Sequence, residues 1–243
     1  MPSNIVVREL RKSYGPVTAL AGVSFDVSEG EVFGLLGPNG AGKTTTLECL
    51  VGLRVPDAGD IAIGGVDARR RLRAVQQRIG VMLQTTALQD KITPREALSV
   101  LGSFYSRREN VNPLLERFSL IDHADTRFER LSGGYRQRLA LALAFVNQPD
   151  TVFLDEPTAG LDPQSRRELR ELIAGMRREG RSVLLTTHDV DEAERLCDRV
   201  AIIDDGAIVA VDRPAALIAS LPSVRTLEDV FLRLTQRDNE KLQ

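Results

Sequence analysis

The chain has few cysteines, no long apolar run and no excess of either charge. Its two cysteines among 243 residues, Cys49 and Cys197, are too few for a disulfide scaffold and indicate reduced, buried thiols. The longest purely apolar run, 139–146, is far shorter than the roughly 20 residues that cross a bilayer. The N-terminus has no apolar segment of the signal-peptide type. We therefore expect a chain without membrane spans, so that any role at a membrane needs another chain to supply them.

The charges are nearly balanced. Lysine and arginine number 32, and aspartate and glutamate 34, for a formal net charge of −2. This balance provides no overall attraction for a phosphate backbone, and we expect no nucleic-acid partner. The basic run 69–71 is interpreted as the solvated face of a helix, and a contact with acidic lipids is the less favoured alternative. A hydrophobic fraction of 42% and a charged fraction of 27% exclude a disordered chain, a collagen-like repeat and a coiled coil.

Short apolar segments alternate with helical patterns along much of the chain, which argues for an α/β fold with a mostly parallel sheet. The segments predicted as strands are 5–7, 19–27, 31–36, 59–65, 81–83, 151–154, 182–187 and 200–203. The segments 44–53, 162–176 and 189–196 are predicted as helices. A further helix is predicted to begin at Thr226, which has the position of an N-cap and is followed three residues later by Asp229.

The middle of the chain is predicted to be helical. Thr93 has the position of an N-cap, Pro94 stands at the first helical position and Glu96 completes a capping box. A further helix is predicted around 139–146, where apolar residues recur at helical spacing. We expect one domain, 1–243, in which a helical subdomain (87–148) is inserted into an α/β core (1–86 and 149–212) and a helical tail follows (213–243).

A phosphate-binding loop follows the apolar strand 31–36. Residues 37–44 match G-x-x-x-x-G-K-[ST] between a strand and a helix, the context that this motif requires. Glycines allow backbone N–H groups to approach phosphate oxygens, and the following helix presents its positive end to the same anion. A glycine-rich turn with an accidental lysine is the alternative, and the strand–loop–helix context disfavours it. The expected ATP-binding residues here are Gly37, Pro38, Asn39, Gly40, Ala41, Gly42, Lys43, Thr44 and Thr45.

Two carboxylates stand at the end of the apolar strand 151–154. Ligands of open parallel sheets bind outside the carboxyl ends of the strands, so Asp155 is expected to hold Mg²⁺ together with the Thr44 hydroxyl. Glu156 is expected to orient or deprotonate an attacking water. Taken alone, the pair is equally well explained as the start of a solvated loop. The phosphate loop upstream favours the interpretation in which Asp155 holds the metal and Glu156 is the base.

These motifs, with Leu131-Ser132-Gly133-Gly134 before a helix, resemble those of the ATP-binding cassette (ABC) ATPases, and the resemblance covers about 5–210. It implies a P-loop NTPase core with an N-terminal antiparallel β-subdomain and an inserted helical subdomain. It also implies roles for further residues around the nucleotide. Tyr14 would stack on adenine, Gln84 would contact Mg²⁺ and the attacking water, and His188 would be the switch histidine that contacts the γ-phosphate. Ser132, Gly133 and Gly134 would form the signature that completes a second copy's site, and Asp162 would belong to the D-loop.

Each of these residues has a simpler explanation when taken singly. Tyr14 alone suggests packing, Gln84 a surface amide, Ser-Gly-Gly a turn and helix cap, and His188 a polar residue at a strand end. Tyr135 departs from the resemblance, because the family usually has glutamine at this position. The difference bears on the fine geometry of the signature and therefore on the rate of ATP hydrolysis. His123 has no motif around it and is interpreted as a surface residue.

The expected function is that of an ATP-hydrolysing subunit of a transporter. The resemblance implies ATP and Mg²⁺, a head-to-tail dimer with an identical or second cassette, and a separate transmembrane permease subunit. This chain itself is then expected to be cytoplasmic and peripheral on the inner face of the cell membrane. The segment 226–232 resembles the endings of ABC-2 drug exporters, which favours export of a drug or lipid-like product, and 85–88 begins the surface where the family docks its membrane partner. Two alternatives are a soluble ABC ATPase in DNA repair or translation and a nucleotide sensor without turnover.

Overall fold

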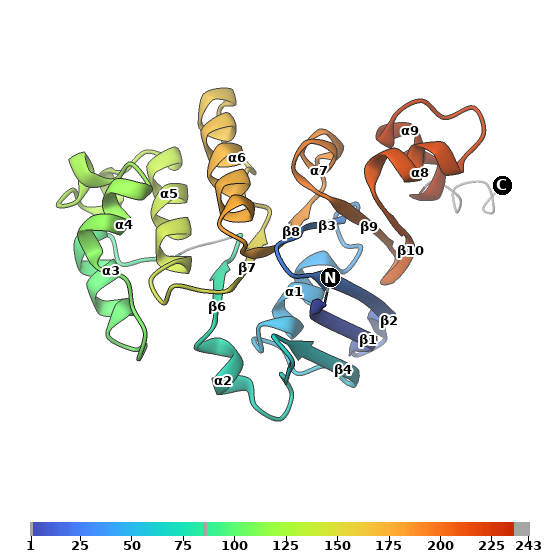
Figure 1. The fold of residues 1–243 in the computed structure, drawn as a ribbon, viewed down its shortest axis with the longest axis horizontal. Coiled ribbons are helices and arrows are strands. Elements are labelled where there is room, and N and C mark those ends of the chain that lie inside the picture. Colours follow the sequence, from blue (N-terminus) through green and yellow to red (C-terminus); the bar gives the residue numbers. More distant parts are fainter. Residues whose placement is uncertain (1, 85–86, 236–243) are drawn as a thin grey trace.

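The computed structural model describes residues 2–84 and 87–235 (Figure 1). Thr85 and Thr86, with which the expected docking surface begins, therefore lie outside the described residues. In the part of the chain that is described, no helix is both long and apolar enough to span a membrane.

A six-stranded sheet with the order β10-β9-β3-β8-β7-β6 forms the centre of the molecule. All neighbouring strands run parallel except β10, which pairs antiparallel with β9. Every residue of β3, β7 and β8 is buried, as expected for strands covered on both faces. The strands are β3 (Val32–Leu36), β6 (Ile79–Met82), β7 (Thr151–Asp155), β8 (Ser182–Thr187), β9 (Arg199–Asp204) and β10 (Ala207–Asp212).

A second, antiparallel sheet with the order β2-β1-β4-β5 is built mainly from the N-terminal residues. Its apolar face packs toward the central sheet, where Phe25 stacks on Phe33 with ring centroids 5.2 Å apart. Its strands are β1 (Ser3–Tyr14), β2 (Val17–Ser28), β4 (Ala58–Ile63) and β5 (Val66–Asp67). The expected mostly parallel sheet with an antiparallel β-subdomain is thus confirmed.

The residues between β6 and β7 form helices, which lie to one side of the sheet in Figure 1. The capping box at Thr93 is present: its side chain accepts from Glu96 N, and the Glu96 carboxylate accepts from Thr93 N. These helices are α3 (Pro94–Gly102), α4 (Val111–Arg117) and α5 (Gly133–Ala144), with the short turns η1 (Ile121–His123) and η2 (Phe128–Arg130). The helices elsewhere are α1 (Lys43–Leu50), α2 (Leu72–Gln76), α6 (Pro163–Arg178), α7 (Val190–Leu196), α8 (Pro214–Ser220) and α9 (Leu227–Thr235).

Two expectations need correction. The run 69–71 is not a helix face: it forms an exposed turn before α2, where the Asp67 carboxylate accepts from the N–H groups of Arg69 and Arg70. The C-terminal region also contains more regular structure than predicted, because β10 and α8 precede the predicted helix that Thr226 caps. Both cysteines are buried, as expected, and burial raises the pKa of the Cys49 thiol to about 11.

Gly80 is the point where the central sheet meets the inserted helices most closely. A Cβ added to Gly80 in β6 would clash with the backbone carbonyl of Ala144 in α5. We expect Gly80→Ala to lower the free energy of unfolding by about 1–3 kcal/mol, because backbone atoms cannot yield as a flexible side chain does. Gly175→Ala in α6 is the matched control, since an added Cβ meets only the Arg178 side chain at 3.7 Å. It should stabilise the chain by about 0.5–1 kcal/mol. Urea denaturation measures both; equal effects would contradict this packing.

Candidate nucleotide site

The loop 37–42 between β3 and α1 has a backbone that only glycine fits at two positions. At Gly42, the N-cap of α1, φ is 103°, and an added Cβ would lie 2.6 Å from the Ala19 carbonyl oxygen. At Gly37, an added Cβ would clash with the Ile203 carbonyl oxygen. Asn39 and Gly40 lie exposed at the tip of the loop. The N–H groups of Gly37 and Ala41 donate within the protein, to Thr187 and Pro38. The loop leads directly into the positive end of a helix, a suitable place for phosphates.

Lys43 lies beneath this loop with 5% of its surface exposed. Its ammonium group donates to the carbonyl oxygens of Gly37 (2.8 Å) and Pro38 (3.0 Å) and forms an ion pair with Glu156 at 3.5 Å. Burial lowers the pKa of Lys43, and the charge of Glu156 opposes that shift. A buried cation is therefore held at the mouth of the glycine loop.

Asp155 ends β7 and is almost fully buried. Its Oδ1 accepts from the hydroxyls of Thr186 (2.5 Å) and Thr44 (3.3 Å). Burial raises the pKa of Asp155, while these two hydrogen bonds lower it. A carboxylate beside a hydroxyl is a donor set that suits Mg²⁺. Among the described residues, no group of three or more His, Cys, Asp and Glu is placed to bind a metal.

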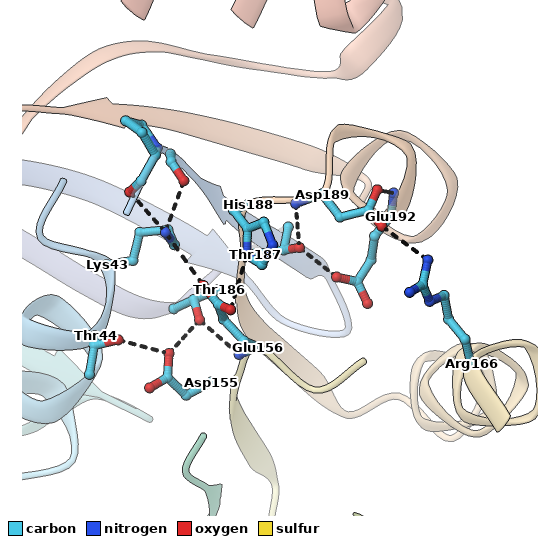
Figure 2. A network of polar contacts seen from close by, with 12 residues as sticks. Lys43, Thr44, Asp155, Glu156, Arg166, Thr186, Thr187, His188, Asp189 and Glu192 are labelled. Atoms are coloured by element: carbon cyan, nitrogen blue, oxygen red, sulfur yellow. Dashed lines mark hydrogen bonds and ion pairs between the residues drawn. The ribbon is translucent and has the colours of Figure 1, made fainter. Parts of the chain in front are cut away.

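Glu156 lies between Lys43 and His188 (Figure 2). Its φ of 47° is in the left-handed region, a strained conformation for this residue that turns the chain sharply after the strand. Its backbone N–H donates to the carbonyl oxygen (3.1 Å) and the hydroxyl (3.0 Å) of Thr186. The carboxylate is buried, and its Oε2 lies 3.0 Å from Nδ1 of His188, whose side chain is half exposed.

The predicted signature lies at the start of α5. Ser132 is the N-cap and its hydroxyl accepts from Tyr135 N at 3.4 Å, so its own proton remains available to an anion. Nothing lies within 4 Å of a Cβ added to Gly133. Asp162 is the N-cap of α6, where it accepts from the backbone of Gln164 and Ser165, and hydrogen bonds from Ser165 lower its pKa. A cavity of about 280 Å³ is lined by Ser132, Gly134, Tyr135, Arg138, Asp162, Gln164, Ser165 and Glu168.

The structure brings together only part of the predicted site. Lys43, Thr44, Asp155, Glu156 and His188 form one contact network. No hydrogen bond or ion pair found among the described residues joins the signature, Tyr14 or Gln84 to that network. The Tyr14 ring is 41% exposed at the end of β1, with Lys12 Nζ 5.6 Å and Arg54 Cζ 5.9 Å from its centroid, so it is not a core residue. Gln84 is exposed just beyond β6.

Sequence reasoning missed two residues near this network, Thr186 and Gln137. Thr186 orients both Asp155 and Glu156, and its signal was a polar residue at the end of an otherwise apolar strand. Gln137 in α5 donates to the Pro157 carbonyl oxygen at 2.5 Å, which connects the signature helix to the residue after Glu156.

His123 was expected to be an isolated surface residue. That expectation is incomplete, because its ring packs against Tyr135, with centroids 4.0 Å apart, although it is partly exposed. The contact joins η1 to the first turn of the signature helix. No sequence motif pointed to this pair.

Comparison with known proteins decides the family. A family model described as "ABC transporter" matches residues 20–159. The Nod factor export ATP-binding protein I of Paraburkholderia xenovorans (strain LB400) is 48% identical over 217 residues, which cover 87% of this chain and 71% of the relative. The chain belongs to the ABC transporter family. It is an ABC-type ATPase, the ATP-binding subunit of a transporter.

Further relatives of this ABC ATPase support the assignment. The protein of the same name from Ralstonia nicotianae is 41% identical, over 91% of this chain and 74% of its own length. The structure of an ATP-binding subunit of an ABC transporter superposes with a TM-score of 0.87 at 28% identity, covering 96% of this chain and 99% of that one. The dimeric structure of MJ0796, a bacterial ABC transporter cassette, does so with a TM-score of 0.79 at 26% identity, covering 86% and 98%. The predicted cassette fold and ATPase class are thereby confirmed.

Thr186→Val tests how this ABC cassette orients its acidic strand end. We expect kcat for ATP hydrolysis to fall about tenfold and the Mg²⁺ concentration for half-maximal activity to rise, because Asp155 and Glu156 lose a shared hydrogen-bonding hydroxyl. Thr186→Ser keeps that hydroxyl and should retain most activity. Phosphate release measured across a Mg²⁺ titration gives both quantities. An unchanged Mg²⁺ dependence in the valine variant would contradict this role.

Proposed function

We propose that the chain hydrolyses ATP between two cassettes and thereby drives export through a separate transmembrane subunit. The observation that carries the proposal is the network in which the Glu156 carboxylate faces both Lys43, under the phosphate loop, and His188. In this proposal the α/β core (1–86 and 149–212) holds the nucleotide, the helical subdomain (87–148) carries the signature, and 213–243 is a helical tail.

The proposed chemistry uses these residues in distinct positions. The amides of the loop 37–42 and the Lys43 ammonium bind the phosphates. Glu156 orients the attacking water and accepts its proton, while His188 contacts the γ-phosphate. Tyr14, exposed and flanked by two cations, offers its ring to adenine. Mg²⁺, when bound, would neutralise phosphate charge; Thr44, Gln84 and Asp155 are the residues that would hold it.

A second copy is proposed to complete the site. Among the described residues no hydrogen bond joins Ser132, Gly133 or Gly134 to Lys43. The helix start is open at Gly133 and has the available Ser132 hydroxyl, whereas Gly134 packs closely on Ser165. In a head-to-tail dimer this turn would meet the γ-phosphate held by the partner subunit, with Asp162 beside it. The dimeric state of the similar bacterial cassette supports this arrangement.

Glu156→Gln tests the base and the dimer together. The amide cannot take a proton from water, so we expect hydrolysis to fall by at least about a hundredfold while ATP still binds. An ATP-bound dimer should then accumulate on size-exclusion chromatography. The Glu156→Gln/Ser132→Ala double variant, which lacks the signature hydroxyl, is expected to need more ATP for dimerisation. Hydrolysis at the unsubstituted rate in Glu156→Gln would show that Glu156 is not the base.

Export is supported by the relatives, which are named for Nod factor export. Nod factor itself is therefore the first candidate cargo, within the drug or lipid-like class expected from the C-terminal segment. The chain would act on the cytoplasmic face of the membrane as a peripheral subunit. No structural feature described above favours action in DNA repair or translation.

A groove lined by apolar residues and by the amide side chains of Gln76, Gln77 and Asn147 is the proposed contact with the transmembrane subunit. It has a volume of about 420 Å³ and lies between the core and the inserted helices, lined by Leu53 and β6 on one side and by Leu101, Phe104 and Tyr105 on the other. Phe104 is 72% exposed and Leu53 54%. Exposed apolar side chains around a groove are typical of a protein interface.

Phe104→Asp tests this contact. Because Phe104 is mostly exposed, we expect unchanged thermal stability and unchanged ATPase activity of the isolated chain. Co-purification with the co-expressed transmembrane subunit should fall about tenfold or more, since a charge would be placed in an apolar interface. Val209→Asp, a change at another exposed apolar residue on β10, should leave co-purification intact. Equal recovery with both variants would place the contact elsewhere.

A further inference from the structure

Glu192 is a buried carboxylate that the proposed chemistry does not use. It lies in the first turn of α7 with 1% of its surface exposed. Its Oε2 accepts from the Thr187 hydroxyl at 2.5 Å. Burial raises the pKa of Glu192, and hydrogen bonds from the hydroxyls of Thr187 and Thr158 oppose that shift. Placing a carboxyl here costs free energy, so a compensating role is expected.

Three hydrogen bonds connect Glu192 to both sides of His188 (Figure 2). The Thr187 hydroxyl donates to Glu192 and accepts from the Asp189 N–H at 3.0 Å. The Asp189 side chain in turn accepts from Glu192 N at 3.1 Å and lies 3.5 Å from the Arg166 guanidinium of α6. Thr187 and Asp189, the two neighbours of His188 in the chain, both take part in these contacts, so the backbone of His188 is held on both sides.

His188 depends on that backbone for its direction. Its side chain is 51% exposed, so packing restrains the ring only on one side. Even so, Nδ1 lies 3.0 Å from the Glu156 carboxylate. We propose that Glu192 is a positioning residue: through Thr187 it holds the turn at 187–189 so that the His188 ring stays on Glu156. The proposal rests on the roles in ATP hydrolysis proposed above for Glu156 and His188.

A role limited to starting helix α7 explains the geometry less well. In an ordinary capping box, a glutamate at the third helical position accepts directly from the N-cap N–H and can do so at the surface. Here the Asp189 N–H donates to Thr187 instead, and the glutamate turns inward to the Thr187 hydroxyl. The inward position adds a desolvation cost and connects the helix to the end of β8.

Nuclear magnetic resonance of the histidine rings in the purified full chain tests the proposal. The chain has two histidines, so His123 serves as an internal reference for His188. We expect Glu192→Ala to shift the His188 ring nitrogen resonances and to leave those of His123 unmoved. Thr187→Val, which removes the relay hydroxyl but keeps the side-chain shape, should cause the same shift and provides the test if Glu192→Ala does not fold. Glu192→Gln keeps an acceptor oxygen and should resemble the unsubstituted chain.

Kinetics on the same variants separates this inference from the proposed function. Glu192→Ala should lower kcat about tenfold with KM for ATP unchanged within about twofold, and Glu192→Gln should restore kcat, because a misplaced His188 affects the reaction more than ATP binding. His188 resonances that stay in place in both Glu192→Ala and Thr187→Val would overturn the positioning role. If instead His188→Ala keeps full kcat while Glu192→Ala moves the His188 resonances, the positioning role stands and the proposed role of the histidine fails.

Discussion

A buried ammonium group is the constraint on which this structure depends. Lys43 is almost inaccessible to solvent, and two loop carbonyl oxygens and one carboxylate surround it. Such a charge is costly to bury without partners. The loop provides the two carbonyl oxygens, because Gly37 and Gly42 allow backbone positions that a side chain would block, and Glu156 after β7 provides the carboxylate. This arrangement places a cation beside the start of helix α1, where the negative charge of a triphosphate would complement both.

The order of the strands brings the reacting groups to that place. In the parallel sheet β3, β8 and β7 are neighbours, so the segments that follow their carboxyl ends supply Lys43, His188 and Glu156 to one edge. The inserted helices carry Ser132 on a separate surface of the same chain. In the proposed function these are two incomplete halves of a nucleotide site, which the assembly of two copies would join. Under that proposal association would depend on ATP, and this dependence would allow the chain to transmit work to a membrane partner.

Sequence reasoning succeeded where a local pattern determines local structure. The glycine loop, the Thr93 capping box and the strand Ser182–Thr187 depend on residues close together in the chain. It missed Thr186 and the contact of Gln137 with Pro157, because those contacts join side chains to segments brought near only by folding. It also missed Glu192, which lies only five positions from Thr187, because a glutamate in the first turn of a helix ordinarily faces solvent. The His123–Tyr135 stack was invisible for the same reason. The roles of Tyr14, Gln84 and Asp162 stay predictions, since they concern a nucleotide and a second copy.

The central claim is that one nucleotide is enclosed by the glycine loop of one copy and the signature turn of another. A crystal structure of the chain with Mg²⁺ and a slowly hydrolysed ATP analogue tests it most directly. The account predicts a head-to-tail dimer in which the Lys43 ammonium contacts the terminal phosphates and the Ser132 hydroxyl of the second copy reaches the γ-phosphate. Nucleotide bound away from Lys43, or a signature turn directed away from the phosphates in the ATP-bound dimer, would contradict it.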